Sequence, residues 1–316
     1  MELYKDALRK GINVNAIITG ATGFVGRALV EELLNHNWKV TVIARKEFGQ
    51  TEQEKQLEII KSDLSEIRNL KKKDFHNLDE DTYFFHLAWD GTSGNARAEI
   101  GLQLSNVEYA CDALKLAVSL SCKKFIYAGS VMEYEAMNCI RQGNGKPGLG
   151  YIYSSAKLAA DIMLRAQAVK YGIEYNNAVI SNIYGPGEKS SRFLNTLLRK
   201  MLRNESMELT AGQQQYDFIY IEDAVAGIRV VAEKGSPFEA YYIGNEKTRK
   251  LKEFILEMKE NLKSSSDLQF GKIPYNGEDL DYKKMGAKSL SEVDFMPKIS
   301  FKEGILRTKK WIASEG

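Results

Sequence analysis

The amino-acid sequence predicts an α/β protein in which a doubly wound parallel sheet is followed by a smaller C-terminal α/β lobe. In the first half of the chain, apolar runs of strand length alternate with helical patterns, which is typical of βαβ units and a parallel sheet. A glycine-rich turn at residues 20–26 joins the first run to the first helical pattern. After the Gly-Pro-Gly at residues 185–187 the alternation loosens, which indicates the start of a second lobe.

Short apolar runs predict the strands, and apolar residues that recur every three or four positions predict the helices. Strands are expected at residues 16–19, 40–44, 57–60, 83–87, 125–128 and 175–180, and later at 207–210, 217–221 and 241–243. Helices are expected after Val25 and at residues 107–120, 153–171, 192–203, 223–233, 251–262 and 305–312. Residues 1–15 have no apolar signal core, and a short helix is expected there.

The bulk composition is ordinary for a soluble globular protein. The 316 residues are 44% hydrophobic and 27% charged, and the net charge of +2 comes without a basic block, so nucleic acid is not an expected partner. No apolar run has the length of a membrane span. The three cysteines form no Cys-x-x-Cys pair and only three histidines are present, so we expect no metal site and a reduced, cytoplasmic enzyme.

The glycine-rich turn predicts a dinucleotide site. Three glycines at residues 20, 23 and 26 follow a strand and open an amphipathic helix. This spacing allows a tight turn, a close approach of the backbone to a pyrophosphate, and close packing of helix on strand. The free N–H groups of the helix N-terminus then face the anion. We therefore expect a Rossmann domain over residues 1–181, with residues 211–245 partly returning to it, and a substrate-binding lobe formed by residues 182–210 and 246–316.

The end of the second strand bears on which dinucleotide is bound. An acidic residue about 20 positions after the glycines would bind both adenosine ribose hydroxyls and repel a 2′-phosphate. The chain has Ala44-Arg45-Lys46 there, with two cations and no carboxylate. NADP(H) is therefore favoured, with NAD(H) as the alternative if these two are ordinary solvated charges. Asp63-Leu64, after the third strand, is placed to meet the adenine.

A tyrosine and a lysine four residues apart on one helix predict acid–base chemistry. Tyr153 and Lys157 share a helical face at this spacing. A free phenol has a pKa near 10, and a nearby ammonium favours the phenolate. Ser130 follows the strand at 125–128, at the carboxyl edge where open α/β sheets place their ligands. Its hydroxyl could orient a substrate oxygen toward Tyr153 while hydride is transferred.

Taken together, the motifs resemble those of the extended short-chain dehydrogenase/reductases, the NAD-dependent epimerase/dehydratase family. The resemblance covers nearly the whole chain and rests on the order and spacing of TGATGFVG (19–26), DL (63–64), HLAW (86–89), Asn106, AGSVMEY (128–134), YSSAK (153–157), NIYGPG (182–187) and DFIYIEDA (217–224). Members of this family mostly act on nucleotide-activated sugars, often as homodimers joined through a four-helix interface.

The resemblance also implies a set of site residues. The catalytic residues would be Ser130, Tyr153 and Lys157. The cofactor, besides these last two, would contact Gly20, Thr22, Gly23, Phe24, Val25, Gly26, Arg45, Asp63, Leu64, Leu87, Ala88, Trp89, Asn106 and Ile183. The substrate would contact Ser130, Val131, Met132, Asn182, Arg192 and Tyr216.

Departures from the family pattern narrow the expected reaction. The family's 4,6-dehydratases carry an acidic pair after the catalytic hydroxyl, where this chain has Val131-Met132, so dehydration is set aside. Arginines usual in the nucleotide-sugar enzymes are replaced by Val179 and Tyr216, which weakens the nucleotide-diphosphate assignment. The first expectation is an NADP(H)-dependent reductase of a keto-sugar, favoured as a nucleotide-linked 4-keto sugar. The alternatives are an NAD-dependent nucleotide-sugar epimerase and, less favoured, a non-catalytic dinucleotide-sensing module.

Overall fold

The computed structural model describes residues 14–46, 48, 54–142, 147–275 and 285–314. The N-terminal helix expected from the sequence lies outside these residues. The main sheet has seven parallel strands in the order β11-β6-β5-β4-β1-β2-β3. In chain order they are β1 (Asn15–Thr19), β2 (Lys39–Ala44), β3 (Leu57–Lys61), β4 (Thr82–His86), β5 (Lys124–Ser130), β6 (Glu174–Ile180) and β11 (Ala240–Ile243).

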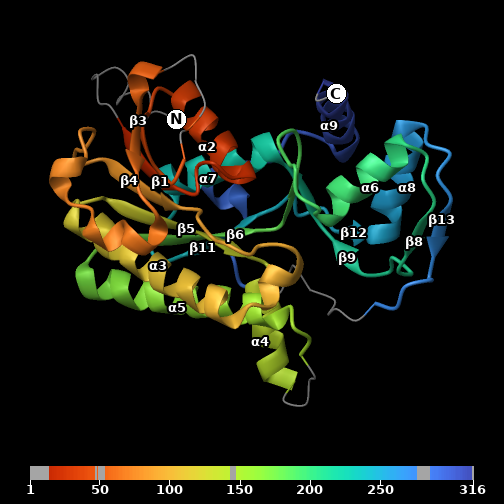
Figure 1. The fold of residues 1–316 in the computed structure, drawn as a ribbon, viewed down its shortest axis with the longest axis horizontal. Coiled ribbons are helices and arrows are strands. Elements are labelled where there is room, and N and C mark those ends of the chain that lie inside the picture. Colours follow the sequence, from red (N-terminus) through yellow and green to blue (C-terminus); the bar gives the residue numbers. More distant parts are fainter. Residues whose placement is uncertain (1–13, 47, 49–53, 143–146, 276–284, 315–316) are drawn as a thin grey trace.

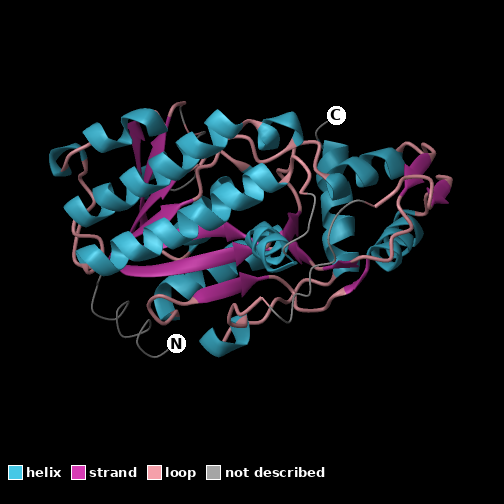
Figure 2. Ribbon diagram, turned by 90° about the horizontal axis from the view of Figure 1, so that it is seen from below, coloured by secondary structure: helices cyan, strands magenta, loops and turns pink. Residues whose placement is uncertain are grey.

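Helices cover both faces of this sheet, which confirms the doubly wound α/β fold (Figure 1). The helices of the described chain are α2 (Phe24–Asn35), α3 (Ile100–Ser119), α4 (Met132–Gln142), α5 (Tyr151–Tyr171), α6 (Phe193–Leu202), α7 (Ile221–Lys234), α8 (Leu251–Leu262) and α9 (Phe301–Ser314). Helices α3 and α5 pack side by side on one face, and α2 and α7 pack together on the other (Figure 2).

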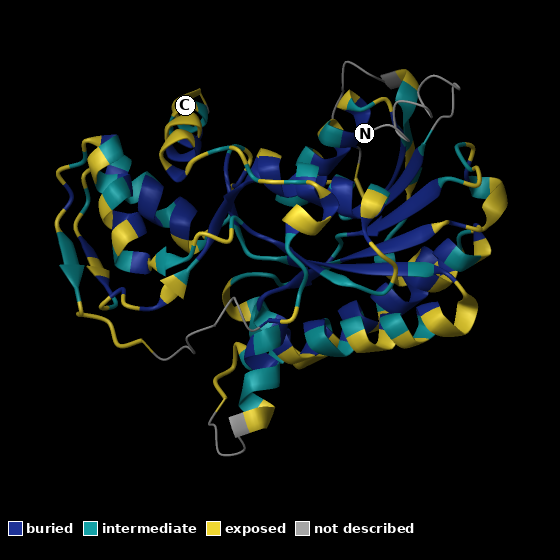
Figure 3. Ribbon diagram, turned by 180° about the vertical axis from the view of Figure 1, so that it is seen from behind, coloured by how far each residue is buried: buried dark blue, intermediate teal, exposed yellow. Residues whose placement is uncertain are grey.

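The core is divided by the sheet because successive strand residues point to opposite faces. Ile17 belongs to the apolar cluster under α3 and α5, and its neighbour Ile18 belongs to the cluster under α2 and α7. Both are fully buried. Figure 3 shows the consequence: the inner strands of the sheet are mostly buried, the edge strand β3 is half-buried to exposed, and the flanking helices alternate buried and exposed positions.

The smaller lobe is built from α6, α8, α9 and short strand pairs. These strands are β7 (Asn182–Tyr184), β8 (Met207–Leu209), β9 (Gln215–Tyr216), β10 (Phe218–Tyr220), β12 (Arg249–Lys250) and β13 (Leu268–Phe270). They pair as β10 with β7, β12 with β9 and β13 with β8. The apolar cluster under α7 continues without interruption into this lobe, through Phe218 to Leu197 and Phe254, so the two lobes share one core.

Most expected elements are present, with shifted ends. Helix α3 begins at Ile100, where a helix was expected from residue 107, and α5 begins at Tyr151 in place of residue 153. The strand expected at 217–221 is shorter, because α7 already begins at Ile221. Helix α4 was not expected at all. Its sequence is rich in polar residues, and its buried side chains include the two carboxylates Glu133 and Glu135, so its burial does not follow the hydrophobicity of its residues.

Candidate active site

The glycine-rich turn forms a cradle whose shape excludes side chains. Gly20 has a φ of +76°, and a Cβ there would lie 2.5 Å from the backbone nitrogen of Ala88. A Cβ on Gly26 would collide with the carbonyl oxygen of Gly20. The turn is closed by a bond from the Gly23 N–H to that same carbonyl, at 3.1 Å. The bare backbone leading into α2 therefore fits a pyrophosphate at the helix N-terminus.

The other residues of this edge lie around the cradle. Thr22 is exposed, Phe24 and Val25 are half-buried at the first turn of α2, and Leu87 and Ala88 follow β4. A Cβ on Gly187 would lie 3.6 Å from the Phe24 ring, so the loop after β7 reaches the same edge. Ile183, in β7, is buried. The structure thus brings motifs from residues 19–26, 86–89 and 182–187 to one edge of the sheet.

Arg45 lies at the carboxyl end of β2, facing the ends of β3 and β4. Its guanidinium is 3.7 Å from Asp63 and 3.6 Å from Asp90, and its side chain is 63% exposed. Asp63 also caps the short 3₁₀ helix η2 (Leu64–Asn69) by accepting from the N–H of Ser65. The bonds from Ser65 and the charge of Arg45 lower the pKa of Asp63. Arg45 is therefore held by two carboxylates at the carboxyl edge of the sheet.

The predicted catalytic residues converge at the carboxyl end of β5. Ser130 is the last residue of that strand, and Tyr153 and Lys157 project from α5, which packs beside it. Ser130 and Tyr153 are hydrogen-bonded through their side chains. The ring of Trp89 contacts both helix residues: its centroid is 6.3 Å from that of Tyr153 and 3.8 Å from the Lys157 Nζ. All three predicted residues are at least nine-tenths buried.

Lys157 is held against the carboxyl end of β5. Its Nζ donates to the carbonyl oxygen of Ala128 at 2.9 Å and lies 4.8 Å from the centre of the Tyr127 ring. The Tyr127 hydroxyl in turn donates to the main-chain oxygen of Lys157. Burial lowers the pKa of Lys157, and the charge of Glu133 opposes this effect.

Tyr153 differs from the expectation of an acidified phenol. Burial raises the pKa of Tyr153, while the hydrogen bond with Ser130 and the charges of Arg97 and Arg192 lower it. The ammonium of Lys157 points to the Ala128 carbonyl, which explains why it is not the main influence on the phenol. The Tyr153 phenol therefore keeps its proton at ordinary pH.

Arg97 borders Tyr153 although the sequence did not predict it as a site residue. It lies in the 3₁₀ helix η4 (Gly94–Ala98), within the loop between β4 and α3, and its guanidinium carbon is 4.5 Å above the Tyr153 ring. Its Nε is buried and has no hydrogen-bond partner in the structure. Because nothing in a loop arginine distinguishes it from a surface charge, only the fold shows that it borders the reacting centre.

The predicted substrate contacts lie around this centre at different depths. Val131 is buried and Met132 half-buried at the turn into α4. The charge of Arg192 is among those that lower the pKa of Tyr153, and the Arg192 guanidinium pairs with Glu188 at 3.6 Å. Tyr216, in β9, is half-buried; burial and the charge of Glu135 raise its pKa, and the charge of Arg97 lowers it.

The side chains of Asn182 and Asn106 both hydrogen-bond to the main chain. The Asn182 amide donates to the main-chain oxygen of Asp217 at 3.0 Å. Asn106 is buried, and both ends of its amide bind the main chain of Asp90, at 2.8 and 3.0 Å. Asn106 therefore fixes the loop after β4. Gln103 assists by accepting from the indole N–H of Trp89 at 2.8 Å.

No group of three or more His, Cys, Asp or Glu side chains is arranged to hold a metal ion in the described part of the chain. None of the helices described is both long and apolar enough to cross a membrane.

Known proteins share this sequence pattern and fold. The model of the NAD dependent epimerase/dehydratase family matches residues 16–244. CDP-abequose synthase of Salmonella typhimurium is 23% identical over 305 residues, covering 92% of this chain and 95% of the synthase. The solved UDP-glucose 4-epimerase of Thermotoga maritima has a TM-score of 0.77 at 22% identity, covering 96% of this chain and 99% of its own. The Bordetella bronchiseptica enzyme WbmF, solved with NADH, has a TM-score of 0.72 at 20% identity, covering 96% and 93%.

Proposed function

Because the chain belongs to the NAD-dependent epimerase/dehydratase family, we propose that this enzyme is an NADP(H)-dependent reductase of a keto-sugar, with a nucleotide-linked 4-keto sugar as the favoured substrate. One observation carries the proposal. The Ser130 hydroxyl is bonded to the Tyr153 phenol, and Lys157 lies one helical turn further along α5, at the sheet edge where the glycine cradle opens.

These residues can complete the reduction of a ketone. A bound nicotinamide dinucleotide would supply the hydride. Tyr153, kept neutral by burial, donates its proton to the carbonyl oxygen as that oxygen becomes an alkoxide. Ser130 holds the same oxygen by a hydrogen bond. Lys157 then stabilises the phenolate that is left.

The residues beside the hydroxyl argue for simple reduction. Dehydration of a sugar needs a further acid and base next to the ketone, and the positions after Ser130 are Val131 and Met132. Neither a valine nor a methionine side chain can act as an acid or a base. The dehydratase reaction is therefore set aside, although dTDP-glucose 4,6-dehydratases are among the relatives.

An epimerase is the second candidate. The fold matches the UDP-glucose 4-epimerase of Thermotoga maritima over nearly its full length, and an epimerase can use the same Ser130, Tyr153 and Lys157. The two reactions differ in cofactor use, since a reductase consumes its cofactor at each turnover and an epimerase regenerates it. Stoichiometric NAD⁺ released on denaturation, without NADPH consumption, would favour the epimerase.

The substrate assignment draws on the relatives and on two arginines. Relatives and structural neighbours are named for CDP- and UDP-linked sugars. Arg97 and Arg192 both bring positive charge to Tyr153, and guanidinium groups are suited to phosphate and carboxylate oxygens. They would take the place of the arginines replaced by Val179 and Tyr216. The smaller lobe, residues 182–210 and 246–316, would hold the rest of the substrate.

The homodimer is proposed from the outer faces of α3 and α5. Ile100 and Leu104 on α3, and Ile162, Met163 and Val169 on α5, are large apolar side chains between 49% and 66% exposed. Adjacent exposed apolar side chains on two packed helices indicate a protein interface. Pairing these helices with those of a second copy would bury them.

NADPH preference is tested with Arg45→Ala. We expect the dissociation constant for NADPH to rise by about tenfold, the loss of one charge-assisted contact, with little change for NADH. Lys39→Ala, which removes a half-buried cation at the opposite end of β2, serves as the matched control. Fluorescence titration with both cofactors makes the measurement. Equal weakening of NADH and NADPH binding would mean that Arg45 is a solvated loop charge.

The reaction is tested by denaturing the purified protein and identifying the released small molecules by mass spectrometry. Keto-sugar nucleotides are then screened for NADPH consumption. An empty site with NADPH consumption supports the reductase. Absence of any NADPH consumption over CDP-, UDP- and dTDP-linked 4-keto sugars would contradict it.

A further inference from the structure

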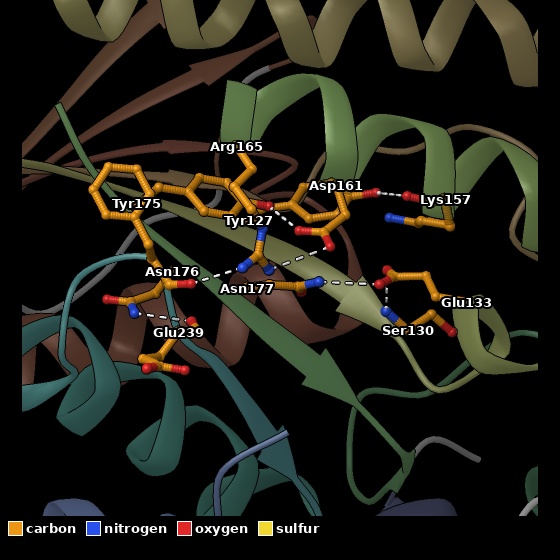
Figure 4. Close-up of polar contacts among 11 residues, drawn as sticks. Tyr127, Ser130, Glu133, Lys157, Asp161, Arg165, Tyr175, Asn176, Asn177 and Glu239 are labelled. Carbon is orange, nitrogen blue, oxygen red and sulfur yellow. Dashed lines mark hydrogen bonds and ion pairs between the residues drawn. The ribbon is translucent and has the colours of Figure 1, made fainter. Parts of the chain in front are cut away.

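A carboxylate is buried directly behind the catalytic residues. Glu133, in the first turn of α4, is 3% exposed. Its Oε1 accepts from the main-chain N–H of Ser130 at 2.8 Å, and its Oε2 accepts from the Asn177 amide at 3.0 Å. Figure 4 shows this chain of contacts running from β6 through Glu133 to the end of β5, with Lys157 close by.

The arrangement suits the ionised form of this side chain. Both carboxyl oxygens act as acceptors of N–H groups, and a protonated carboxyl would need an acceptor for its own proton. The absence of a side chain at Gly129 leaves room for Glu133 and Asn177. A Cβ at that position would collide with the Asn177 amide oxygen and lie 2.8 Å from Glu133 Oε1. Burial and the charge of Asp161 raise the pKa of Glu133, while the two donors and Lys157 lower it.

Within the described structure, the other ionisable groups around Lys157 are neutral or paired with another residue. His86, on β4, is buried, and burial lowers its pKa to about 3, so it is neutral. Burial raises the pKa of Tyr127, on β5, far above its ordinary value, and also raises that of Tyr153. Asp161, the next carboxylate along α5, accepts from the Tyr175 hydroxyl at 2.7 Å and is 3.5 Å from Arg165.

From this geometry we propose that Glu133 is a positioning residue, the internal counter-charge that keeps Lys157 an ammonium inside the closed site and so sets the highest pH at which the enzyme works. This inference rests on the proposed acid–base function of Tyr153 and Lys157. It adds a residue that contacts neither substrate nor cofactor. Glu133 acts on one side through the charge of Lys157 and on the other through the backbone of Ser130.

The sign of the effect follows from the charges. An ammonium in a buried site is disfavoured by the loss of water and favoured by a nearby anion. Removing the anion therefore lets Lys157 lose its proton at a lower pH. Since reduction needs the ammonium, the alkaline limb of kcat/KM moves to lower pH as well.

The first test follows Lys157 itself in the protein without any ligand. Protein is labelled with ¹³C at the lysine Cε, and the Lys157 signal is assigned by its loss in Lys157→Met. In Glu133→Gln, which preserves the side-chain shape and one acceptor oxygen, the titration midpoint of this signal is expected to fall by about one pH unit or more. In Glu133→Asp, which retains the charge, it stays nearer to the wild-type value.

The control is Glu135→Gln. Glu135 is a second buried carboxylate of α4 and accepts from the Ser154 hydroxyl at 2.7 Å. It is not among the charges that act on Lys157. The Lys157 midpoint in this variant should equal that of the wild type.

The second test is the pH profile of kcat/KM. Glu133→Gln should move the alkaline limb downward by the same amount as the NMR midpoint, whereas a purely structural role would lower kcat/KM equally at every pH. An unchanged Lys157 midpoint in Glu133→Gln, or the same change in Glu135→Gln, overturns the inference. Because the NMR titration needs no substrate, it decides this question even if the proposed reductase reaction fails.

Discussion

Strand β5 has a buried lysine at each end, and the two lysines differ in what satisfies them. Lys124, the first residue of the strand, donates to the carbonyl oxygen of Gly235 at 2.7 Å and is 3.4 Å from Glu174, a carboxylate that is 40% exposed. Lys157 meets the other end of β5 at Ala128. Burial lowers the pKa of both lysines. Lys124 therefore has a direct ion pair with a partly exposed carboxylate. Lys157 has no carboxylate in direct contact in the described structure, and the nearby anion is the buried Glu133.

The difference separates a lysine with a structural role, Lys124, from the lysine proposed to act in catalysis, Lys157. An ammonium has three donors. Lys124 donates to Gly235 and pairs with Glu174, so its ammonium is satisfied by the protein at the amino end of β5. Lys157 has one acceptor, Ala128, and two aromatic rings around it in the described structure, which leaves donors for a ligand at the carboxyl edge. Parallel sheets place their ligands at that edge, so position along one strand separates the two roles.

The largest expected effect is at the residue that Lys157 supports. Tyr153→Phe removes the proton donor and keeps the ring against Trp89. We expect kcat to fall by about 10²–10⁴-fold, with the NADPH dissociation constant nearly unchanged. Stopped-flow turnover and fluorescence titration measure the two quantities. Turnover equal to wild type would remove Tyr153 from the chemistry.

The next effect is at Lys157. Lys157→Met removes the ammonium and retains a similar stem, and we expect turnover to fall by about 10²-fold because the phenolate loses its stabilising charge. Steady-state kinetics at several pH values measures the change. The comparison between the two lysines fails if Lys157→Met turns over as fast as the matched variant Lys124→Met.

The smallest effect on activity is expected at the amino end of β5. Lys124→Met leaves the Gly235 carbonyl without its donor and should destabilise the fold by about 1–3 kcal/mol, while kcat remains within about twofold of the wild type. Denaturant unfolding and steady-state kinetics provide the two readouts. A large loss of turnover with unchanged stability would reverse the roles assigned to the two lysines.

The sequence was sufficient for the features that depend on local spacing. Gly20 and Gly26 have the close backbone contacts that the glycine spacing predicted, and the strands alternate with helices in the predicted order. Ser130, Tyr153 and Lys157 meet as expected, because a strand end and one helical face fix where they point. The roles assigned to these residues remain predictions until the variants are measured.

The features that the sequence did not predict depend on contacts between distant segments. Glu133 is a charged residue of a largely polar helix, and the amide that its carboxylate binds, Asn177, lies on the distant strand β6. Arg97 comes to the Tyr153 ring only through the path of the loop after β4. The high pKa of Tyr153 also has a tertiary cause, since burial outweighs the nearby charges. Spacing within one segment contains none of this information.

The central claim is that Tyr153 and its neighbours complete a hydride transfer to a sugar ketone. The most direct measurement follows the transferred atom: the enzyme is incubated with a nucleotide-linked 4-keto sugar and NADPH deuterated at the transferable C4 position. We predict one deuterium at the former carbonyl carbon for each NADPH oxidised, and almost none with Tyr153→Phe in the same time. An unlabelled sugar product, or label transfer at the wild-type rate in that variant, would contradict the account.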